Sequence, residues 1–388
     1  MTNVAVVGVG QTKFGELWEH SLRDLGVKAA AAALGDAKAE AGIVQSLYIG
    51  NMSAGRFLGQ EHLGALIADN LGIPHIPAVR CEAACASGSV ALRSAYLDIK
   101  SGNADAALVV GVEKMTDLAN DEVSMTLAAA GDQEWEAGIG LTFAGLYALM
   151  ARAHMHKFGT TREQLAMVSV QNHSNGKNNP YAQFNMAVTL EDVLNSSVVA
   201  DPLRLLDCSP ITDGAAAALL VSDKLAKQFE NPVWILASEQ ANDAVALHDR
   251  KSIVEMQAAK MAAKKAYEKT GLSAKHMDVA EVHDCFSINE IISLEALGFC
   301  EPGRGGKFVE SGAAALDGEI PVNTTGGLKS IGHPVGATGV RQICDIVRQL
   351  RGDSINQIKG AKTGMNLNVG GSGATAVVNI LGNELKGA

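Results

Sequence analysis

One cysteine stands where a turn passes into a helix, a position that can activate a thiol. Cys85 lies in EAACASGSVALRSA, in which Gly88 indicates a tight turn and the following residues are typical of a helix. The free backbone N–H groups and positive dipole end of such a helix favour a thiolate and can lower the thiol pKa well below about 8.5. We therefore interpret Cys85 as a nucleophile. The alternative is a buried structural cysteine.

A histidine in the second half of the chain suits the base that such a nucleophile needs. His333 lies in SIGHPVGATG, where three glycines and a proline surround it. These residues fix a tight backbone and allow a substrate to approach closely. We interpret His333 as a base beside Cys85. The alternative is a histidine that only caps the turn.

A second histidine and a second thiol follow a short apolar run. His283 and Cys285 begin the segment HDCFSINE, directly after DVAEV. Open α/β sheets carry their reactive groups at the carboxyl ends of strands, and period-two spacing places both side chains on one side if the chain stays extended. Between them, Asp284 is expected to cap a helix that begins near Ser287.

The stretch NLNVGGSGA (366–374) predicts a glycine-rich turn before the last strand. It lacks the lysine and the spacing of a phosphate loop, so a nucleotide site is not expected, whereas its N–H groups could stabilise an oxyanion. A zinc site built from Cys81, Cys85, His283 and Cys285 is the weaker alternative, because CEAAC is not a CxxC pair. We expect no metal.

Short apolar runs alternate with alanine-rich helical stretches, which favours an α/β layered fold. The runs interpreted as strands are 3–10, 46–52, 106–114, 215–223 and 374–381, and the helical stretches include 21–34 and 61–72. Runs as apolar as 106–114 are typical of a parallel sheet that is covered on both faces.

The two halves of the chain echo each other. From Cys85 a turn leads into a helix closed by Gly102, and from His333 a similar turn leads into a helix closed by Gly352. This pattern predicts a duplicated βαβ unit whose pseudo-twofold axis brings the two helix entrances together. Residues 119–200 differ in texture and are interpreted as an inserted loop domain, with 171–185 as loop.

Composition restricts the function further. The chain has 388 residues and a net charge of −10, so two large domains or a duplicated unit are expected and polyanion binding is disfavoured. The six cysteines are too few and too scattered for a disulfide scaffold. No apolar run approaches the about 18 residues of a membrane span, and no signal peptide is recognised. We expect a cytoplasmic protein that binds neither nucleic acid nor membrane.

Five motifs together resemble the thiolase family, in order and over nearly the whole chain. They are EAACASGSVALRSA, CSPITDGAAAALLVSD, HDCF, GHPVGATG and NVGGSGA. HDCF and NNPYAQF are similar to the sterol-carrier-protein-type branch and to archaeal acetoacetyl-CoA thiolases. The resemblance implies a five-layered αβαβα fold of two duplicated halves. The N-terminal half would span 1–118 and 201–230, the loop domain 119–200, and the C-terminal half 231–388.

The resemblance also implies a division of roles. Cys85 would accept the acyl group, and His333 would be the base that activates the Cys85 thiol. Cys285 would remove the α-proton of the second acetyl-CoA. His283 and His333 would hold the enolate oxygen, and the amides of Cys85 and Gly370 would form a second oxyanion hole. Many thiolases keep their second cysteine in a C-terminal CxG motif, where this chain has Asn368-Val369-Gly370. Cys285 would supply the missing thiol.

The implied activity is acetyl-CoA C-acetyltransferase, in either direction, with coenzyme A thioesters as substrates and no cofactor. Alternatives are a thiolase for longer 3-ketoacyl chains, a decarboxylating ketoacyl synthase, which Cys285 disfavours, and a non-catalytic acyl-CoA-binding or scaffold protein. The resemblance further implies a homodimer or homotetramer. It also implies a complex with hydroxymethylglutaryl-CoA synthase and a small zinc-ribbon/OB-fold protein that leads toward mevalonate.

Overall fold

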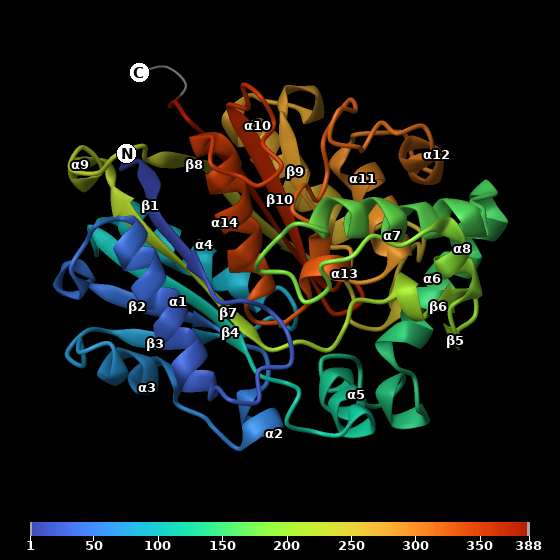
Figure 1. Cartoon of the computed structure of the whole chain (residues 1–388), viewed down its shortest axis with the longest axis horizontal. Coiled ribbons are helices and arrows are strands. Elements are labelled where there is room, and N and C mark those ends of the chain that lie inside the picture. The colour runs from blue at the N-terminus through green and yellow to red at the C-terminus, as the bar shows by residue number, and fades with distance from the viewer. Residues whose placement is uncertain (1, 386–388) are drawn as a thin grey trace.

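The computed structural model describes residues 2–385. Strands from both halves of the chain form one mixed sheet. Nine strands are hydrogen-bonded in the order β3-β2-β4-β7-β1-β8-β11-β10-β9 (Figure 1). The first five positions hold β1 (Val4–Gln11), β2 (Ser46–Gly50), β3 (Ala78–Cys81), β4 (Ala106–Glu113) and β7 (Gly214–Ser222). The last four hold β8 (Val233–Asn242), β9 (Val279–Glu281), β10 (Thr363–Gly370) and β11 (Thr375–Gly382). The two groups are joined where Ala5 and Val6 of β1 pair with β8.

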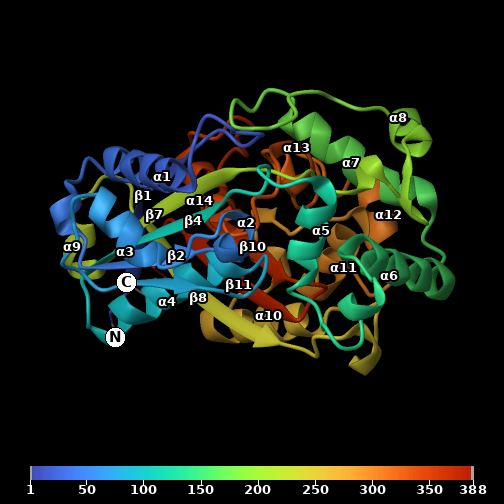
Figure 2. The ribbon, with the colours of Figure 1, turned by 90° about the horizontal axis from the view of Figure 1, so that it is seen from below.

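Six helices arrange these two groups of strands into layers (Figures 1 and 2). Outer helices α1 (Leu22–Asp36) and α3 (Leu63–Asn70) cover the first group, and α10 (Gln257–Thr270) covers β8 and β11, with α11 (Ser287–Leu297) beside it. Between the groups lie α4 (Ser87–Ser101) and α14 (Thr338–Arg351), which pack against strands of both and against each other. The five-layered αβαβα arrangement predicted from the sequence is therefore confirmed.

The direction of the strands differs from the expectation of a parallel sheet. β4 runs parallel to β2 but antiparallel to β7, and β7 is also antiparallel to β1. All nine residues of β7 are buried, because helices cover both faces of the sheet. A strand buried on both faces has an uninterrupted apolar sequence whichever way its neighbours run, so the pattern did not report direction.

The inserted segment is mainly helical. It contains α5 (Asn120–Ala128), α6 (Phe143–Phe158), α7 (Arg162–Gly176), α8 (Leu190–Asn195) and β5 (Val198–Ala200), which pairs with β6 (Leu203–Arg204). Residues 171–176, expected to be loop, form the end of α7. A capping box at Thr161 starts this helix and outweighs the polar character of its last turns. The domain boundaries given above stay a prediction.

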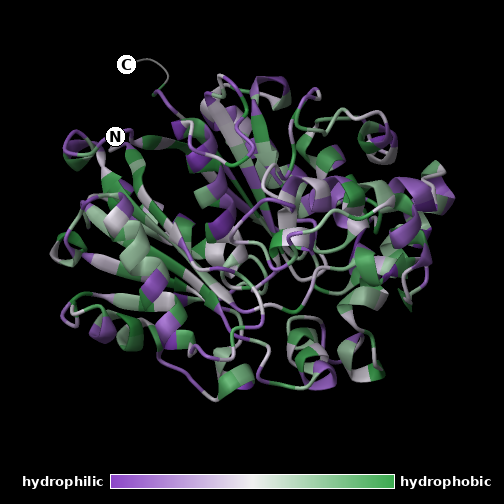
Figure 3. Ribbon diagram, in the orientation of Figure 1, coloured by the Kyte–Doolittle hydropathy of each residue, from purple (hydrophilic) through white to green (hydrophobic). Residues whose placement is uncertain are grey.

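The remaining α-helices of the described residues are short: α2 (Ala54–Leu58), α9 (Asp223–Ala226), α12 (Gly305–Glu310) and α13 (Gly327–Ile331). Figure 3 shows hydrophobic residues along the strands of the first half and many hydrophilic residues on the peripheral helices. Among the described residues, none of the helices has the length and hydropathy needed to cross a bilayer.

Glycines allow the starts of α4 and α14 to touch. A Cβ atom on Gly88 would lie 2.7 Å from the Gly336 carbonyl oxygen, and one on Gly339 would lie 2.5 Å from the Ser89 nitrogen. Both approaches are closer than a side chain permits, so the two helices meet backbone to backbone. This contact brings the turns that carry Cys85 and His333 to the same place, as the duplicated pattern predicted.

Candidate active site

Cys85 lies in the turn between β3 and α4. The Ser87 hydroxyl closes this turn, since it accepts from the Ala83 N–H at 2.9 Å and donates to the Ala84 carbonyl at 2.6 Å. Ala84 has a φ of 51°, in the left-handed region that few residues other than glycine adopt. The thiol is thereby placed just ahead of the first turn of α4.

A cavity of about 100 Å³ lies in front of this thiol and is mainly apolar. Its walls include Cys85, Cys285 and His333, so two cysteines that are distant in sequence face one small space. The other lining residues are Met115, Leu127, Phe143, Tyr147, Ser209, Pro210, Ile211, Phe286, Val335 and Gly371.

His333 has one ring nitrogen fixed and one free. Its Nδ1 lies 2.7 Å from the Thr338 hydroxyl, which itself donates to the Pro334 carbonyl at 3.1 Å. Because that hydroxyl proton is already used, Nδ1 must be the donor, and Nε2 carries the lone pair. Nε2 is buried without a partner among the described residues. The histidine is therefore oriented as a base.

His283 has the opposite tautomer. The Asn368 amide donates to the Cys85 carbonyl at 3.0 Å, and the same NH2 group lies 3.1 Å from His283 Nδ1. Nδ1 is thus an acceptor, so Nε2 carries the proton, and this N–H has no partner in the described part of the chain. The His283 and His333 rings meet edge to face with centroids 4.9 Å apart.

Burial sets the charge state of these groups. It lowers the pKa of His333 to about 3, with a further contribution from the Arg341 cation, and it lowers the pKa of His283 as well. Burial raises the pKa of Cys85 to about 12, although the amides of Gly371 and of Cys85 itself hydrogen-bond to the sulfur and oppose the shift. The same cause raises the pKa of Cys285. Near neutral pH the site therefore holds two thiols and two neutral imidazoles.

This result corrects the expectation of a lowered pKa at Cys85. The cavity walls remove water from the sulfur, and the two amides compensate for only part of that loss. The resting thiol consequently needs a base to become a nucleophile. His333 Nε2 can serve as one, because a ligand atom of each of Cys85, His283 and His333 lies within 4.8 Å of the others.

The glycine turn before the last strand also reaches the site. The amide that hydrogen-bonds to the Cys85 sulfur belongs to Gly371, which also lines the cavity. The part of Gly370 as an oxyanion donor stays a prediction. Arg250 secures the turn, since its guanidinium donates to the Ser372 carbonyl at 2.6 Å and to the Ser372 hydroxyl at 3.0 Å.

Asp284 does not cap the helix that follows it. The N-cap of α11 is Phe286, which makes no side-chain capping bond. The Asp284 carboxylate instead accepts from the backbone N–H groups of Leu328 and Lys329, at 2.7 and 3.2 Å, in the first turn of α13. The expected capping role was right in kind but wrong in partner, because the structure brings the start of a distant helix to this carboxylate.

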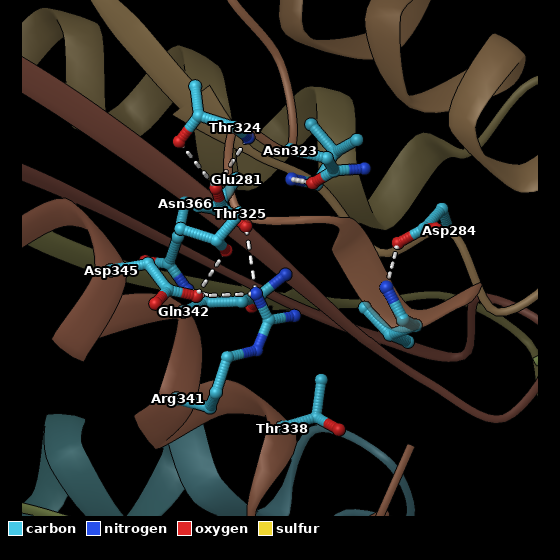
Figure 4. A network of polar contacts seen from close by, with 12 residues as sticks. Glu281, Asp284, Asn323, Thr324, Thr325, Thr338, Arg341, Gln342, Asp345 and Asn366 are labelled. Carbon is cyan, nitrogen blue, oxygen red and sulfur yellow. Dashed lines mark hydrogen bonds and ion pairs between the residues drawn. The ribbon is translucent and has the colours of Figure 1, made fainter. Parts of the chain in front are cut away.

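A buried ionic network joins β9 to α14 (Figure 4). Arg341 of α14 donates to Glu281 at 2.9 Å and to Asp345 at 2.7 Å, and all three residues are almost fully buried. Glu281 also accepts from the Thr324 N–H at 3.0 Å, and Thr325 donates to Asp345 at 3.0 Å. This network ties β9, which leads to His283, to the helix that follows His333.

The four residues of the weaker zinc alternative, Cys81, Cys85, His283 and Cys285, do not form one group of potential metal ligands. The Cys81 thiol donates to the Ser94 hydroxyl at 3.8 Å and packs with the core residues between α4 and the strands. The group of potential ligands that does converge is Cys85, His283 and His333. Their hydrogen bonds, described above, suit proton transfer.

Sequence reasoning missed three residues that orient the site. Thr338 and Asn368 fix the tautomers of the two histidines, and Tyr147 lines the cavity from the inserted segment. Thr338 lay within the motif GHPVGATG, and Asn368 was noted only as a departure from the common pattern. Nothing in the sequence around Tyr147 signalled a site, because α6 is an ordinary apolar helix.

Together, a duplicated α/β fold and paired thiols beside neutral imidazoles define a cysteine-dependent acyl-transfer enzyme. Two family models match the chain: "Thiolase, N-terminal domain" over residues 4–224 and "Thiolase C-terminal domain-like" over residues 239–383. The chain belongs to the thiolase family.

Individual relatives agree with this assignment. The chain is 53% identical to an acetyl-CoA acetyltransferase of Methanothermobacter thermautotrophicus over 98% of its own length and 99% of the relative. It is 37% identical to sterol carrier protein 2 of Bos taurus, covering 96% of this chain and 71% of that protein. Among solved structures, the Ltp2-ChsH2(DUF35) aldolase superimposes with a TM-score of 0.85 at 26% identity, over 98% of this chain and 97% of that one.

Proposed function

We propose that this chain is an acetyl-CoA C-acetyltransferase. It condenses two acetyl-CoA molecules to acetoacetyl-CoA and coenzyme A, or catalyses the reverse thiolysis. The observation that carries the proposal is that Cys85 and Cys285 line one small cavity with His333. The naming of relatives that are about half identical over the full length supports it.

In the first step the acetyl group moves to Cys85. His333 Nε2 takes the Cys85 proton, the sulfur attacks the thioester carbonyl, and the departing coenzyme A thiolate takes the proton of Cys285. The oxyanion of the tetrahedral intermediate is held by the amides that reach the Cys85 sulfur, those of Cys85 and Gly371, with Gly370 as the donor that the resemblance implied. The products are acetyl-Cys85, a protonated His333 and a Cys285 thiolate.

In the second step a carbon–carbon bond forms. The Cys285 thiolate removes a proton from the α-carbon of a second acetyl-CoA, and the electron pair of that C–H bond forms an enolate. The Nε2–H groups of His283 and of protonated His333 hold the enolate oxygen. The enolate carbon attacks the acetyl carbonyl, the bond to Cys85 breaks, and His333 returns its proton to Cys85, which restores the starting state.

Trapping of the intermediate tests this assignment. After incubation with acetyl-CoA, mass spectrometry should find one acetyl group on Cys85, absent in Cys85→Ser. Cys285→Ala should still acquire the acetyl group but condense about 10²- to 10⁴-fold more slowly, the usual contribution of one proton-transfer group. Cys300→Ala, which removes a thiol outside the cavity, is the matched control. Normal condensation by Cys285→Ala would refute the roles, and the lack of any adduct would favour the scaffold alternative.

The size of the cavity favours short acyl groups. About 100 Å³ enclosed by side chains such as Phe143, Phe286 and Leu127 suits acetyl and acetoacetyl groups better than long chains. We therefore propose coenzyme A thioesters of short acids as substrates, without a resident cofactor. Comparison of kcat/KM for acetoacetyl-CoA and for longer 3-ketoacyl-CoA thioesters tests this preference.

We also propose that the chain works in an assembly. The name of the structural neighbour joins Ltp2 to ChsH2(DUF35), and this supports a protein partner for the present chain. That the partner is a small zinc-ribbon/OB-fold protein rests on family resemblance. The homodimer or homotetramer, the hydroxymethylglutaryl-CoA synthase, the cytoplasmic location and the link to mevalonate rest on family resemblance. Co-purification from the native organism and measurement of molar mass in solution test them.

A further inference from the structure

Tyr147 joins the two sides of the cavity from outside the two halves that carry the motifs. It lies on α6 and is 1% exposed. Its hydroxyl donates to the Gly371 carbonyl at 3.0 Å, and its ring is stacked on Phe286 with centroids 4.7 Å apart. The ring is thus clamped while the hydroxyl holds the turn whose amide reaches the Cys85 sulfur.

Tyr147 also faces Cys285. Tyr147 and Cys285 line the same small cavity, the Tyr147 ring stacks on Phe286, the residue next to Cys285, and each of the two side chains influences the pKa of the other. Cys285 also receives a long contact of 3.6 Å from the Asn289 amide. Asn289 is committed to the His283 carbonyl at 2.5 Å. Tyr147 is therefore a hydroxyl placed to respond to a change in the charge of Cys285.

We propose that Tyr147 is a positioning residue that stabilises the Cys285 thiolate during condensation while holding the Gly371 turn in the resting state. The proposal rests on the proposed function, in which Cys285 alternates between thiol and thiolate. In the resting state the Cys285 S–H donates to the hydroxyl oxygen, and the hydroxyl donates to Gly371. When Cys285 loses its proton, the hydroxyl proton rotates toward the sulfur. Tyr147 neither gains nor loses a proton.

The charged groups around Tyr147 and Cys285 act on them through space, and the cations among them donate their hydrogen bonds elsewhere. Cys85, Lys329 and Asp284 act on Cys285 through space, and Arg250 and Cys85 act on Tyr147. Lys329 donates to the Asp207 carbonyl at 2.5 Å, and Arg250 is held by Ser372. Hydrogen bonds to a charged atom are stronger than those to a neutral one. The hydrogen bond from the Tyr147 hydroxyl to the Cys285 sulfur therefore becomes stronger when the thiolate forms.

Substitution of the hydroxyl alone tests the proposal. In a Cys85→Ser background, the rate at which iodoacetamide alkylates Cys285 is followed against pH by mass spectrometry of its peptide. Tyr147→Phe should move this profile to higher pH and slow alkylation at a given pH about 10-fold or more. In the otherwise native chain, Tyr147→Phe should lower kcat about 10- to 100-fold with a small effect on KM.

Tyr267→Phe is the matched control. The Tyr267 hydroxyl also joins a carbonyl, that of Leu297 at 2.9 Å, to a sulfur, that of Met365 at 3.6 Å, and it does not line the cavity. A Tyr147→Phe alkylation profile that coincides with that of Tyr267→Phe would overturn the proposal, even if turnover falls, because the loss would then be structural. A different result would show that the proposed function itself is wrong, namely normal condensation by Cys285→Ala.

Discussion

Replacement of Thr338 by valine is expected to slow acetylation of Cys85 about 10- to 100-fold without changing the fold. Valine keeps the branched shape but removes the oxygen 2.7 Å from His333 Nδ1. The imidazole is then left with a buried N–H that has no acceptor, which costs about 1–3 kcal/mol. It can avoid this cost by moving the proton to Nε2, but the ring then has no lone pair facing Cys85.

In both cases the tautomer with its lone pair on Nε2, the one that can act as a base, lies about 1–3 kcal/mol higher in free energy than in the native chain. Since about 1.4 kcal/mol corresponds to a tenfold change, the expected loss is about 10- to 100-fold. Rapid quenching followed by mass spectrometry of the Cys85 peptide measures the rate, and guanidinium unfolding reports stability. Thr338→Ser, which keeps the hydroxyl, should retain most activity. A folded Thr338→Val variant that acetylates Cys85 as fast as the native chain would refute the tautomer assignment.

Three further predictions concern stability. Gly88→Ala should cost about 1–3 kcal/mol of unfolding free energy because its Cβ would meet a backbone oxygen at 2.7 Å, whereas Gly35→Ala, with open space and a helical position, should be neutral or stabilising. Arg341→Met should cost about 3–5 kcal/mol, since it removes the buried cation that pairs with Glu281 and Asp345; an unchanged melting temperature would contradict this. Burial lowers the pKa of His333 in the folded protein to about 3, against an ordinary value of 6.5, so the unfolded chain binds more protons and the histidine destabilises the fold as pH falls from 6.5 toward 3. The unfolding free energy of His333→Asn relative to the native chain should therefore rise by about 1.4 kcal/mol for each unit by which the pH is lowered through that range. A difference that stays flat in denaturant titrations would exclude a neutral buried His333.

The sequence contained enough to predict the layers and the meeting of the two helix entrances. Burial on both faces, glycine helix ends at Gly102 and Gly352, and a repeated turn-helix pattern are local signals, and each is found in the structure. Strand direction was not available from such signals, because an antiparallel β7 and a parallel strand bury the same side chains. The partner of Asp284 was also hidden, since it depends on a helix more than forty residues away.

For the candidate site, too, the sequence predicted some features and not others. Residue types and motifs located Cys85, Cys285, His283 and His333, but the sequence did not report their charge states. Those depend on how completely the cavity excludes water and on contacts made across the fold. The expectation of a lowered Cys85 pKa considered the helix end and left out burial, and in the folded protein burial is the larger effect.

Asn368 shows how a departure in one motif is linked to another. It stands where many thiolases keep their second cysteine, and its amide bridges the Cys85 carbonyl and His283 Nδ1. The amide at this position therefore sets the tautomer of the histidine that accompanies Cys285. Asn368→Ala should leave acetylation of Cys85 within about threefold but slow condensation about 10- to 100-fold, because His283 loses the donor that keeps its proton on Nε2. Isotope exchange of the α-hydrogens of acetyl-CoA measures the second step. If acetylation falls as far as condensation, the bond to the Cys85 carbonyl, and not the one to His283, is what the site requires from this residue.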